Sequence, residues 1–421
     1  MTTVDTSSSP RTQAPGSQSW SVGQQVEQYF GRVRGGDMGA LPAVLGLIVL
    51  CVFFGVKRSL FFSDGNFANL FTQGAQVTII AMGLVFVLLL GEIDLSAGFA
   101  SGLAGAVMSV LLVNHHVPWY LSIVAAVVTG VVIGLVLGFL VAKVRIPSFV
   151  VTLAAFLAFQ GILLLLLKGG NAITNTSNTI FAIDNNNMPP WLGWALLIVG
   201  AAGYALVQLL RIRSRASRGL RTDPILLVTI RVGLLLVLGG IAVYFLNQER
   251  SHNPLRNSLK GVPIVVAVIL ALLLVGTFVL SRTTYGRHIY AVGGSAEAAR
   301  RAGIGVDRIR ISAFVICSAT AAVGGIVAVS RANSVDSTTG GSNILLYAVA
   351  AAVIGGTSLF GGKGRVLDAV LGGAVVAVID NGMGLLGLSS GAKFGFTGLV
   401  LLLAAGVDAL SRRRAAATGL R

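Results

Sequence analysis

Charged residues are scarce in this chain of 421 residues. Asp, Glu, Lys and Arg together make up 11% of it, whereas about 25% is usual in a soluble globular domain. Hydrophobic residues make up 55%, and the mean hydropathy is +0.85. This composition excludes a soluble globular protein and predicts an integral membrane protein.

Cysteine and histidine are rare as well. Cys51 and Cys317 both lie inside apolar runs, which excludes a disulfide framework and predicts two small buried hydrophobic side chains. The four histidines are spread over three loops, without Cys or acidic partners at the spacing of metal ligands. No Ser/His/Asp or Cys/His grouping occurs in the sequence. We therefore predict no metal, no cofactor and no catalytic residue, so the chain is not expected to be an enzyme.

Acidic residues are the scarcer of the two charged kinds. Asp and Glu number 15 against 31 Lys and Arg, which gives a formal charge of +16. Such a charge indicates nucleic acid as a partner only when the basic residues form a patch on a folded soluble domain. Here they lie in short loops between apolar runs, so we predict no nucleic-acid partner.

Long apolar runs fill the chain from residue 41 to residue 410. About 20 helical residues cross a hydrocarbon core of roughly 30 Å, so the runs predict an all-α, polytopic membrane domain of about twelve spans. Residues 1–40 are polar and predict a disordered cytoplasmic tail, and residues 411–421 predict a basic cytoplasmic tail. The predicted spans are 41–56, 69–91, 95–113, 118–142, 148–167, 190–210, 224–246, 262–280, 311–330, 343–360, 365–381 and 394–410.

The basic residues also predict the orientation of these spans. With the N-terminus inside, the cytoplasmic segments contain 22 Lys and Arg and the outer segments contain 8, while Arg231 lies within a span. Because positive charge is retained on the cytoplasmic side, both termini are predicted to be cytoplasmic.

Two carboxylates interrupt the apolar stretch LVFVLLLGEIDLSAGFASGLAG at residues 84–105. On one continuous helix Glu92 and Asp94 would point about 200° apart and one would face lipid, so a break at Gly91 is predicted. Asp94 or Ser96 can then cap the following helix by accepting from its free backbone amides. Capping does not explain Glu92, which is either a pathway or gating residue or a buried hydrogen-bond partner of a neighbouring helix.

Two glycine patterns predict close backbone packing or internal repetition. Gly130, Gly134 and Gly138 form a G-x-x-x-G-x-x-x-G ladder, which allows another helix backbone to approach closely. Residues 355–362 share the pattern Gly-x-x-[Asp/Ser]-Leu-x-x-Gly with residues 91–98, which indicates an internal parallel repeat of a kind found in transporters.

One stretch imitates an ATP site. GTSLFGGKG at residues 356–364 resembles a phosphate loop, but it fails the pattern G-x-x-x-x-G-K-[ST] in its spacing and in Gly364 after the lysine. We therefore predict that the chain has no ATPase site of its own.

A short helix is predicted inside the loop at residues 281–310. Ser295 can cap the strongly helix-forming segment AEAARRAG, and Gly303 ends it. A capped helix of small residues is suited to docking into a groove on a partner protein. The alternative is an ordinary basic loop that anchors the topology.

Three stretches carry a resemblance to a known family. They are GEIDLSAG (91–98), YGRHIYAVGGSAEAARRAGI (285–304) and VIGGTSLFGGKGRVLDAVLGGAVVAVIDNGMGLLGL (353–388), and VRIPSFVVTLAAFLAFQGI (144–162) is similar to the family's pattern as well. The chain resembles the membrane permease subunits of bacterial ABC-type monosaccharide importers, of the ribose and xylose type.

The resemblance implies a permease in the bacterial cytoplasmic membrane. It implies pairing with a second copy, an ABC ATPase subunit that binds the ATP, and sugar delivery by an extracytoplasmic binding protein. Ribose-type members usually have Gly where this chain has Glu92. Glu92 and the extra stretch at about 205–260, beyond a ten-span core, are more similar to the xylose branch, which implies a pentose. The resemblance places the coupling helix at about 295–303, with Ser295, Glu297, Ala298, Ala299, Arg300, Arg301 and Gly303.

A neutral sugar needs hydrogen-bonding side chains along its path rather than a fixed charge. Polar residues in or at the ends of the predicted spans are therefore the pathway candidates, and a structural hydrogen bond between helices is the alternative for each. The candidates, with the residues of the GEIDLS motif, are Gln73, Gln76, Glu92, Asp94, Ser96, Gln160, Asn333, Asp380 and Asn381.

Two other functions compete with the importer. An ion-coupled secondary sugar transporter could use Glu92 and Asp94 as its ion site, but the helix at 295–303 would then have no role. A membrane enzyme or a channel-like scaffold is the other possibility, and the lack of a catalytic or metal-ligand cluster argues against it.

Overall fold

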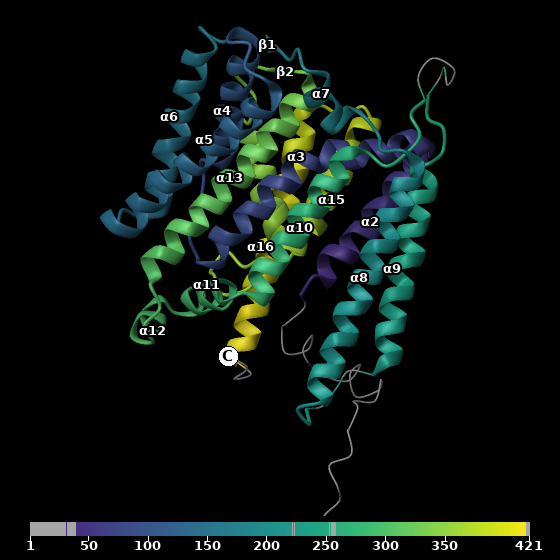
Figure 1. The fold of residues 1–421 in the computed structure, drawn as a ribbon, viewed down its shortest axis with the longest axis vertical. Coiled ribbons are helices and arrows are strands. Elements are labelled where there is room, and N and C mark those ends of the chain that lie inside the picture. Colours follow the sequence, from purple (N-terminus) through teal and green to yellow (C-terminus); the bar gives the residue numbers. More distant parts are fainter. Residues whose placement is uncertain are drawn as a thin grey trace, which may run out of the picture. The chain divides into compact units, whose positions relative to one another are not determined.

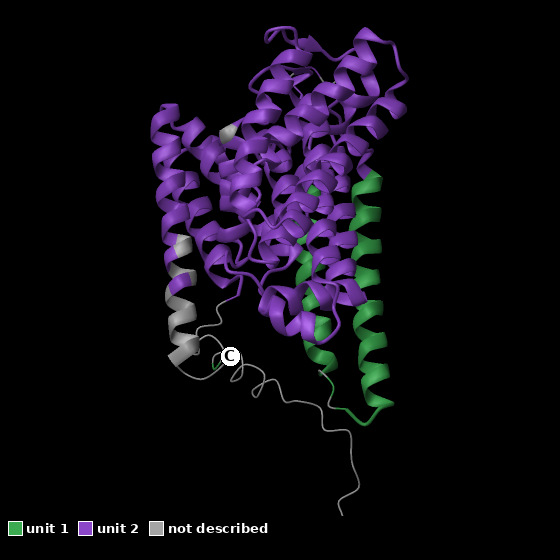
Figure 2. Ribbon diagram, turned by 90° about the vertical axis from the view of Figure 1, so that its left-hand side faces the viewer, with its two compact units in different colours: residues 1–35, 191–244 green, residues 36–190, 245–421 purple. Residues whose placement is uncertain are grey.

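Figure 1 shows the computed structural model of the chain. It describes residues 39–220, 224–251 and 258–417, together with Gly31, Thr222 and Asn253. Most of the predicted tail at residues 1–40 lies outside the described residues. The chain divides into two compact units, residues 1–35 with 191–244 and residues 36–190 with 245–421, which Figure 2 shows in separate colours.

The larger unit is built from long apolar helices joined by short connections. They are α2 (Leu41–Lys57), α3 (Asp64–Leu89), α4 (Ala97–Ser109), α5 (Trp119–Phe139), α6 (Ser148–Leu166), α10 (Ile264–Arg282), α13 (Val306–Ala332), α14 (Ser342–Ile354), α15 (Val366–Leu385) and α16 (Ser390–Ala417). α16 thus continues into the predicted basic tail.

Shorter elements lie between these helices. They are η1 (Ser59–Phe62), the π-helical turns η2 (Val110–Asn114) and η3 (Leu140–Val144), α7 (Asn178–Asn185), α11 (Thr284–Gly294), α12 (Ala296–Arg301), and the strands β1 (Ile173–Thr174) and β2 (Ser334–Val335). The two strands are antiparallel, with Ile173 opposite Val335.

The smaller unit is a helical hairpin. It contains nearly all of α8 (Pro190–Ala216) and α9 (Ile225–Leu246), and it overlaps the extra segment predicted at about 205–260. The two helices touch near one end, where a Cβ on Gly239 would collide with the side chain of Leu197.

Each of the twelve predicted spans contains one apolar helix of the structure. Among the described residues, nine helices are long and apolar enough to cross a membrane. The other three apolar helices are shorter, at Leu41–Lys57, Asn343–Ile354 and Ser390–Leu403. The span predicted at 343–360 was too long. α14 ends at Ile354 because Gly355 and Gly356 turn the chain, with Gly356 at φ +117°.

The core of the larger unit is formed around α3 and α13, which pack against each other and against α4, and α13 also packs on α5 (Figure 1). The glycine ladder explains the α5–α13 contact, because a Cβ on Gly130, Gly134 or Gly138 would come within less than 3.0 Å of α13 backbone atoms. The predicted close approach of a second backbone is therefore confirmed. α15 packs on the other side of α3.

Candidate functional site

The short helix predicted at about 295–303 is present as α12, preceded by a helix that sequence reasoning missed. Ser295 caps α12, because its hydroxyl accepts from the backbone amide of Ala298 at 3.2 Å. Glu297 in the first turn forms ion pairs with Arg300 and Arg301 at 3.5 and 3.1 Å. Gly303 follows the helix at φ +82°, a conformation that favours glycine.

The faces of α12 differ in exposure. Ala299 is buried and points into the larger unit, whereas Ala298 and Arg300 are exposed. The segment before α12, residues 284–294, forms α11, whose N-terminus is capped by the hydroxyl of Thr283, which accepts from Gly286 at 3.1 Å. The described chain therefore presents a two-helix projection, with the outward side of α12 free of contact with the rest of the larger unit.

Three of the motif stretches meet beside this projection. The amide of Gly362 donates to the carbonyl of Leu89 at 2.8 Å, which ties the loop after α14 to the end of α3. A Cβ on Gly293 of α11 would collide with the same carbonyl. The hydroxyl of Tyr290 donates to the carbonyl of Gly364 at 2.7 Å. The two loops with the repeated glycine pattern thus pack against each other and against α11.

Glu92 lies at this end of the larger unit, in the loop between α3 and α4. Its Oε1 is 3.1 Å from Nε of Arg310 on α13, and the two side chains are 15% and 26% exposed. The pair borders a cavity of about 460 Å³ that is also lined by Arg145, Ser148 and Arg300. The partner of Glu92 is therefore a charged group next to α12.

Asp94 and Ser96 are fully buried in the same loop. Oδ1 of Asp94 accepts from the backbone amide of Ser96 at 2.8 Å and from its hydroxyl at 2.6 Å. The thiol of Cys317 on α13 donates to Oδ2 at 3.5 Å. The first two bonds form a local turn just before α4, because both come from Ser96, the residue before the first helical one, and Ser96 itself makes no side-chain cap bond to the helix.

The opposite end of α3 and α13 holds a second cavity, which we call the polar pocket. Its volume is about 370 Å³, within the range of small-molecule sites. α3 contributes its first turns, α13 contributes Arg331 at its last turn, and α7 and the segment before α10 close the sides. The pocket is lined by Gly65, Ala68, Asn69, Thr72, Asp184, Asn185, Asn187, Arg250, Leu259, Pro263 and Arg331.

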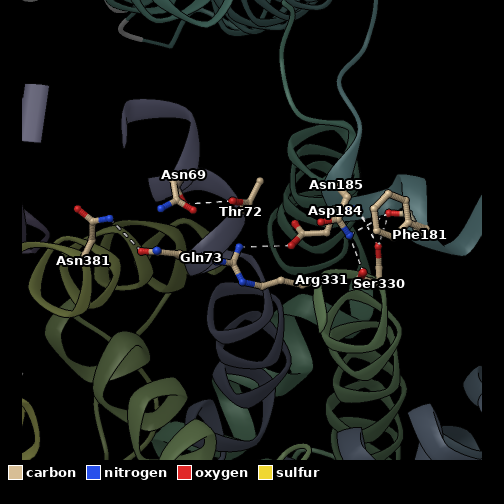
Figure 3. A network of polar contacts seen from close by, with 9 residues as sticks. All are labelled: Asn69, Thr72, Gln73, Phe181, Asp184, Asn185, Ser330, Arg331 and Asn381. Atoms are coloured by element: carbon tan, nitrogen blue, oxygen red, sulfur yellow. Dashed lines mark hydrogen bonds and ion pairs between the residues drawn. The ribbon is translucent and has the colours of Figure 1, made fainter. Parts of the chain in front are cut away.

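Asp184 and Arg331 face each other in the polar pocket (Figure 3). Nη1 of Arg331 lies 3.6 Å from Oδ2 of Asp184, whose side chain is fully buried, whereas that of Arg331 is 37% exposed. Neither carboxylate oxygen has a hydrogen-bond donor among the described residues. Burial raises the pKa of Asp184 to about 7, and the nearby Arg331 opposes part of that rise.

The main chain around Asp184 is fixed by Ser330. The Ser330 hydroxyl accepts from the amide of Asp184 at 2.9 Å and donates to the carbonyl of Phe181 at 3.0 Å. The amide side chain of Asn185 donates to the Ser330 carbonyl at 2.6 Å. α7 is thereby held against the end of α13, and Figure 3 shows these contacts around Ser330.

Arg250 lines the polar pocket from a loop that hydrogen bonds to the adjacent Glu249 hold in place. The guanidinium donates to the carbonyls of Leu246 and Gly261 at 2.7 and 2.9 Å. The Glu249 carboxylate accepts from the amide of Leu259 and the hydroxyl of Ser258, and these bonds lower its pKa to about 2. Arg250 therefore ties the loop together with its charged group.

The predicted pathway residues fall into separate places. Gln73 and Asn381 lie together between α3 and α15, where Nδ2 of Asn381 donates to Oε1 of Gln73 at 3.0 Å (Figure 3). The same nitrogen also donates to Oδ1 of Asn66 at 2.8 Å. Gln76 lies one helical turn beyond Thr72, and its amide nitrogen is buried without a hydrogen-bond partner among the described residues.

The remaining three candidates lie apart from one another. Asn333 ends α13 in a left-handed conformation, and its carbonyl accepts from the amide of Asn175 at 2.9 Å. Asp380 on α15 forms an ion pair with Lys393 on α16 at 3.4 Å. Gln160 is half-buried on α6.

Sequence reasoning missed the charged residues of the polar pocket. Asp184 lies on α7, Arg250 in the loop after α9 and Arg331 in the last turn of α13, and they meet only through the fold. One signal was available, because Asp184 begins the polar run DNNN at residues 184–187 in a chain with few charges.

The two cavities lie at opposite ends of the same helices. α3 begins at the polar pocket and ends at Leu89, beside the α12 projection, and α13 runs the other way from Arg310 to Arg331. Each helix has 26 or 27 residues, so the ends are about 40 Å apart. That separation exceeds the roughly 30 Å hydrocarbon core of a bilayer.

A sequence family described as "Branched-chain amino acid transport system / permease component" matches residues 66–405, which include α12 and the lining residues of both cavities except Gly65. The chain belongs to this permease family. The xylose transport system permease protein XylH of Escherichia coli K12 is 35% identical to the permease over 386 residues, which are 91% of this chain and 95% of the relative.

Other relatives cover the permease almost as fully. XylH of Haemophilus influenzae is 32% identical over 372 residues, 88% of this chain and 96% of the relative. The ribose import permease protein RbsC of Escherichia coli K12 is 30% identical over 366 residues, 87% of this chain and 92% of the relative. No solved structure matches the chain.

Proposed function

We propose that the permease is the membrane-spanning subunit of an ATP-driven importer that carries a monosaccharide, a pentose such as xylose, delivered by an extracytoplasmic binding protein. Two observations together support this most. The xylose and ribose permeases are similar to this chain over most of its length, and the structure has an exposed, capped helix at one end of α3 and α13 and a polar pocket at the other end. A secondary transporter needs no such projecting helix.

α12 is the proposed contact with the ATPase subunit. Ser295 and Gly303 define its ends, Glu297, Arg300 and Arg301 hold it as a compact charged unit, and Ala298 leaves room for a partner's surface. Ala299 anchors the helix to the permease. Conformational changes of the ATPase would then reach the motif loops through α11, whose Gly293 touches the carbonyl of Leu89.

The permease supplies no ATP site of its own in this proposal. Residues 356–364 follow the helix α14 and not a strand, and α15 begins only at Val366, so the strand–loop–helix arrangement of a phosphate loop is lacking there. ATP would be bound and hydrolysed by the partner.

The polar pocket is the proposed entrance of the sugar pathway. Asn69 and Thr72 line it, and the unpartnered amide of Gln76 follows on the same face of α3 one turn deeper. At the other end, the Glu92–Arg310 ion pair would act as the inner gate. The bonded residues Gln73, Asn381, Asp94, Ser96 and Asn333 would keep the pathway helices in position.

Twelve spans with both termini in the cytoplasm are proposed for the membrane domain at residues 41–410. The polar pocket then faces outward and α12 faces the cytoplasm. Asp380 is 46% exposed within α15, and a carboxylate at that depth requires protein or water around it. A second copy of the permease in a homodimer would supply the protein surface around Asp380. Gln160, on α6, remains a separate candidate for the sugar pathway.

Charge-reversal on α12 tests this assignment. Arg300→Glu and Ala298→Glu are expected to lower ATP-driven uptake about tenfold or more in vesicles that contain the partner subunits, with unchanged membrane insertion. Ser217→Glu, at an exposed position in the hairpin, adds the same single negative charge as Ala298→Glu; it is the control for that variant and is expected to transport normally. Normal uptake by both α12 variants would refute the docking role.

A further inference from the structure

The hairpin α8–α9 is nearly free of burial. Large apolar side chains along both helices are more than half exposed, among them Ile198, Val199, Leu206, Leu234 and Val237. Side chains of this kind on a membrane helix face the acyl chains of lipid. The proposed sugar pathway uses none of this surface, so the hairpin needs another role.

Charge on the hairpin is almost entirely of one sign and lies at one end. Residues 191–246 contain six arginines and one acidic residue, Asp223. Arg211, Arg213, Arg215 and Arg218 are all exposed near the end of α8 and the turn after it. No carboxylate of the described residues forms an ion pair with any of them.

The opposite end of α8 carries tryptophan. Trp191 is 68% exposed and Trp194 is 37% exposed. Twenty residues separate Trp191 from Arg211, which corresponds to about 30 Å along a helix, the thickness of the hydrocarbon core. Exposed tryptophan marks one interface of a bilayer, so the arginines lie at the level of the headgroups of the other leaflet.

Arg231 is the distinctive member of the set. It lies on α9, six residues from the start of the helix, and is exposed among apolar neighbours without an ion pair to any described carboxylate. The contact between Gly239 and Leu197 fixes the register of the hairpin and places Arg231 about 9 Å deeper than Arg211. A charged side chain at that depth is stable only if it extends to the interface and finds an anion there.

We propose that the arginine end of the hairpin binds the phosphate of an anionic phospholipid headgroup, with Arg231 beneath the phosphate and with Arg211 and Arg215, which share one face of α8, beside it. Guanidinium groups bind phosphate through two parallel hydrogen bonds, and an anionic lipid adds a second favourable charge interaction. The exposed apolar side chains below the arginines contact the acyl chains of the same lipid. The proposal is independent of the transported substrate.

Native mass spectrometry of the full permease tests the proposal. The purified protein would be titrated with phosphatidylglycerol and, separately, with phosphatidylcholine. Each arginine near an anionic membrane surface contributes about a five-fold gain in binding, so the double variant Arg211→Gln/Arg231→Gln is expected to lose phosphatidylglycerol binding roughly 25-fold. The double Lys variant keeps the charge and the topology but loses the paired hydrogen bonds, and intermediate binding is expected.

Two controls separate the alternatives. Lys57→Gln/Arg58→Gln removes two exposed positive charges at the end of α2 and is expected to leave lipid binding unchanged. Inorganic phosphate is expected not to displace the lipid. Equal loss in this control variant, equal binding of phosphatidylcholine, or displacement by inorganic phosphate alone would each overturn the proposal. If the Gln double variant fails to insert into the membrane, the Lys variants decide the test. Unchanged phosphatidylglycerol binding by Arg211→Lys, Arg231→Lys and their combination would overturn the proposal.

Discussion

Asp184 makes the stability of the permease depend on pH in a defined direction. Its carboxyl has a pKa of about 7 in the folded protein, compared with an ordinary value of 3.8. A folded-state pKa above the unfolded one means that the native state binds the proton more tightly. The contribution to stability is therefore greatest below about pH 4 and is lost as the pH rises to about 7. The difference of about three pH units corresponds to on the order of 4 kcal/mol.

The Asp184→Asn variant isolates this effect, because an amide has the same shape and does not titrate. We expect the free energy of unfolding of the purified wild type, measured by thermal unfolding in detergent, to fall by on the order of 4 kcal/mol relative to the variant as the pH rises from about 4 to about 7. Outside that range the free energies of the two proteins should change with pH in parallel. Removing the charge that stabilises the carboxylate, by Arg331→Gln, should extend the upper end of the range above pH 7. The reasoning would be refuted if the wild type and Asp184→Asn depended on pH in parallel over the whole range. It would also be refuted if Arg331→Gln moved the upper end of the pH-dependent range below pH 7.

Three further predictions follow from the motif loops and the α3–α15 contact. Gly293→Val should destabilise the permease by about 1–3 kcal/mol because the side chain would meet a carbonyl, whereas Gly294→Ala, with open space around it, should melt like the wild type in the same thermal assay. Glu92→Gln removes the charge opposite Arg310, so uptake should fall while the melting temperature changes little, and unchanged uptake would end the gating proposal. Asn381→Ala leaves two amide groups without their bonds and should lower stability by about 1–3 kcal/mol, measured by thermal unfolding, and no change would show that these bonds are not needed.

Local patterns in the sequence predicted much of the fold. The apolar runs located the twelve apolar helices, because an element that faces lipid must be apolar along its whole length. The glycine ladder predicted the close contact of α5, and Ser295 with Gly303 predicted the bounds of α12 within two residues. Each of these signals lies within one short segment of the chain.

Features that depend on distant residues were not predictable in this way. α7 is only eight residues long and is held by Ser330, which is more than 140 residues away. The meeting of Asp184 with Arg331 depends on that contact. The partner of Glu92 was also missed, because Arg310 was interpreted as part of a cytoplasmic loop, whereas α13 begins at Val306 and includes it. The span at 343–360 was drawn too long because Gly355 and Gly356 have no polar side chain that would mark a break in the apolar run, yet they turn the chain.

The most direct test of the proposed function is uptake of labelled xylose into membrane vesicles that contain the permease with its ATPase and binding protein. We expect uptake that requires ATP and the binding protein and that persists when ion gradients are collapsed. Uptake that continues after ATP is removed and stops when the ion gradients are collapsed would contradict the importer and favour an ion-coupled transporter.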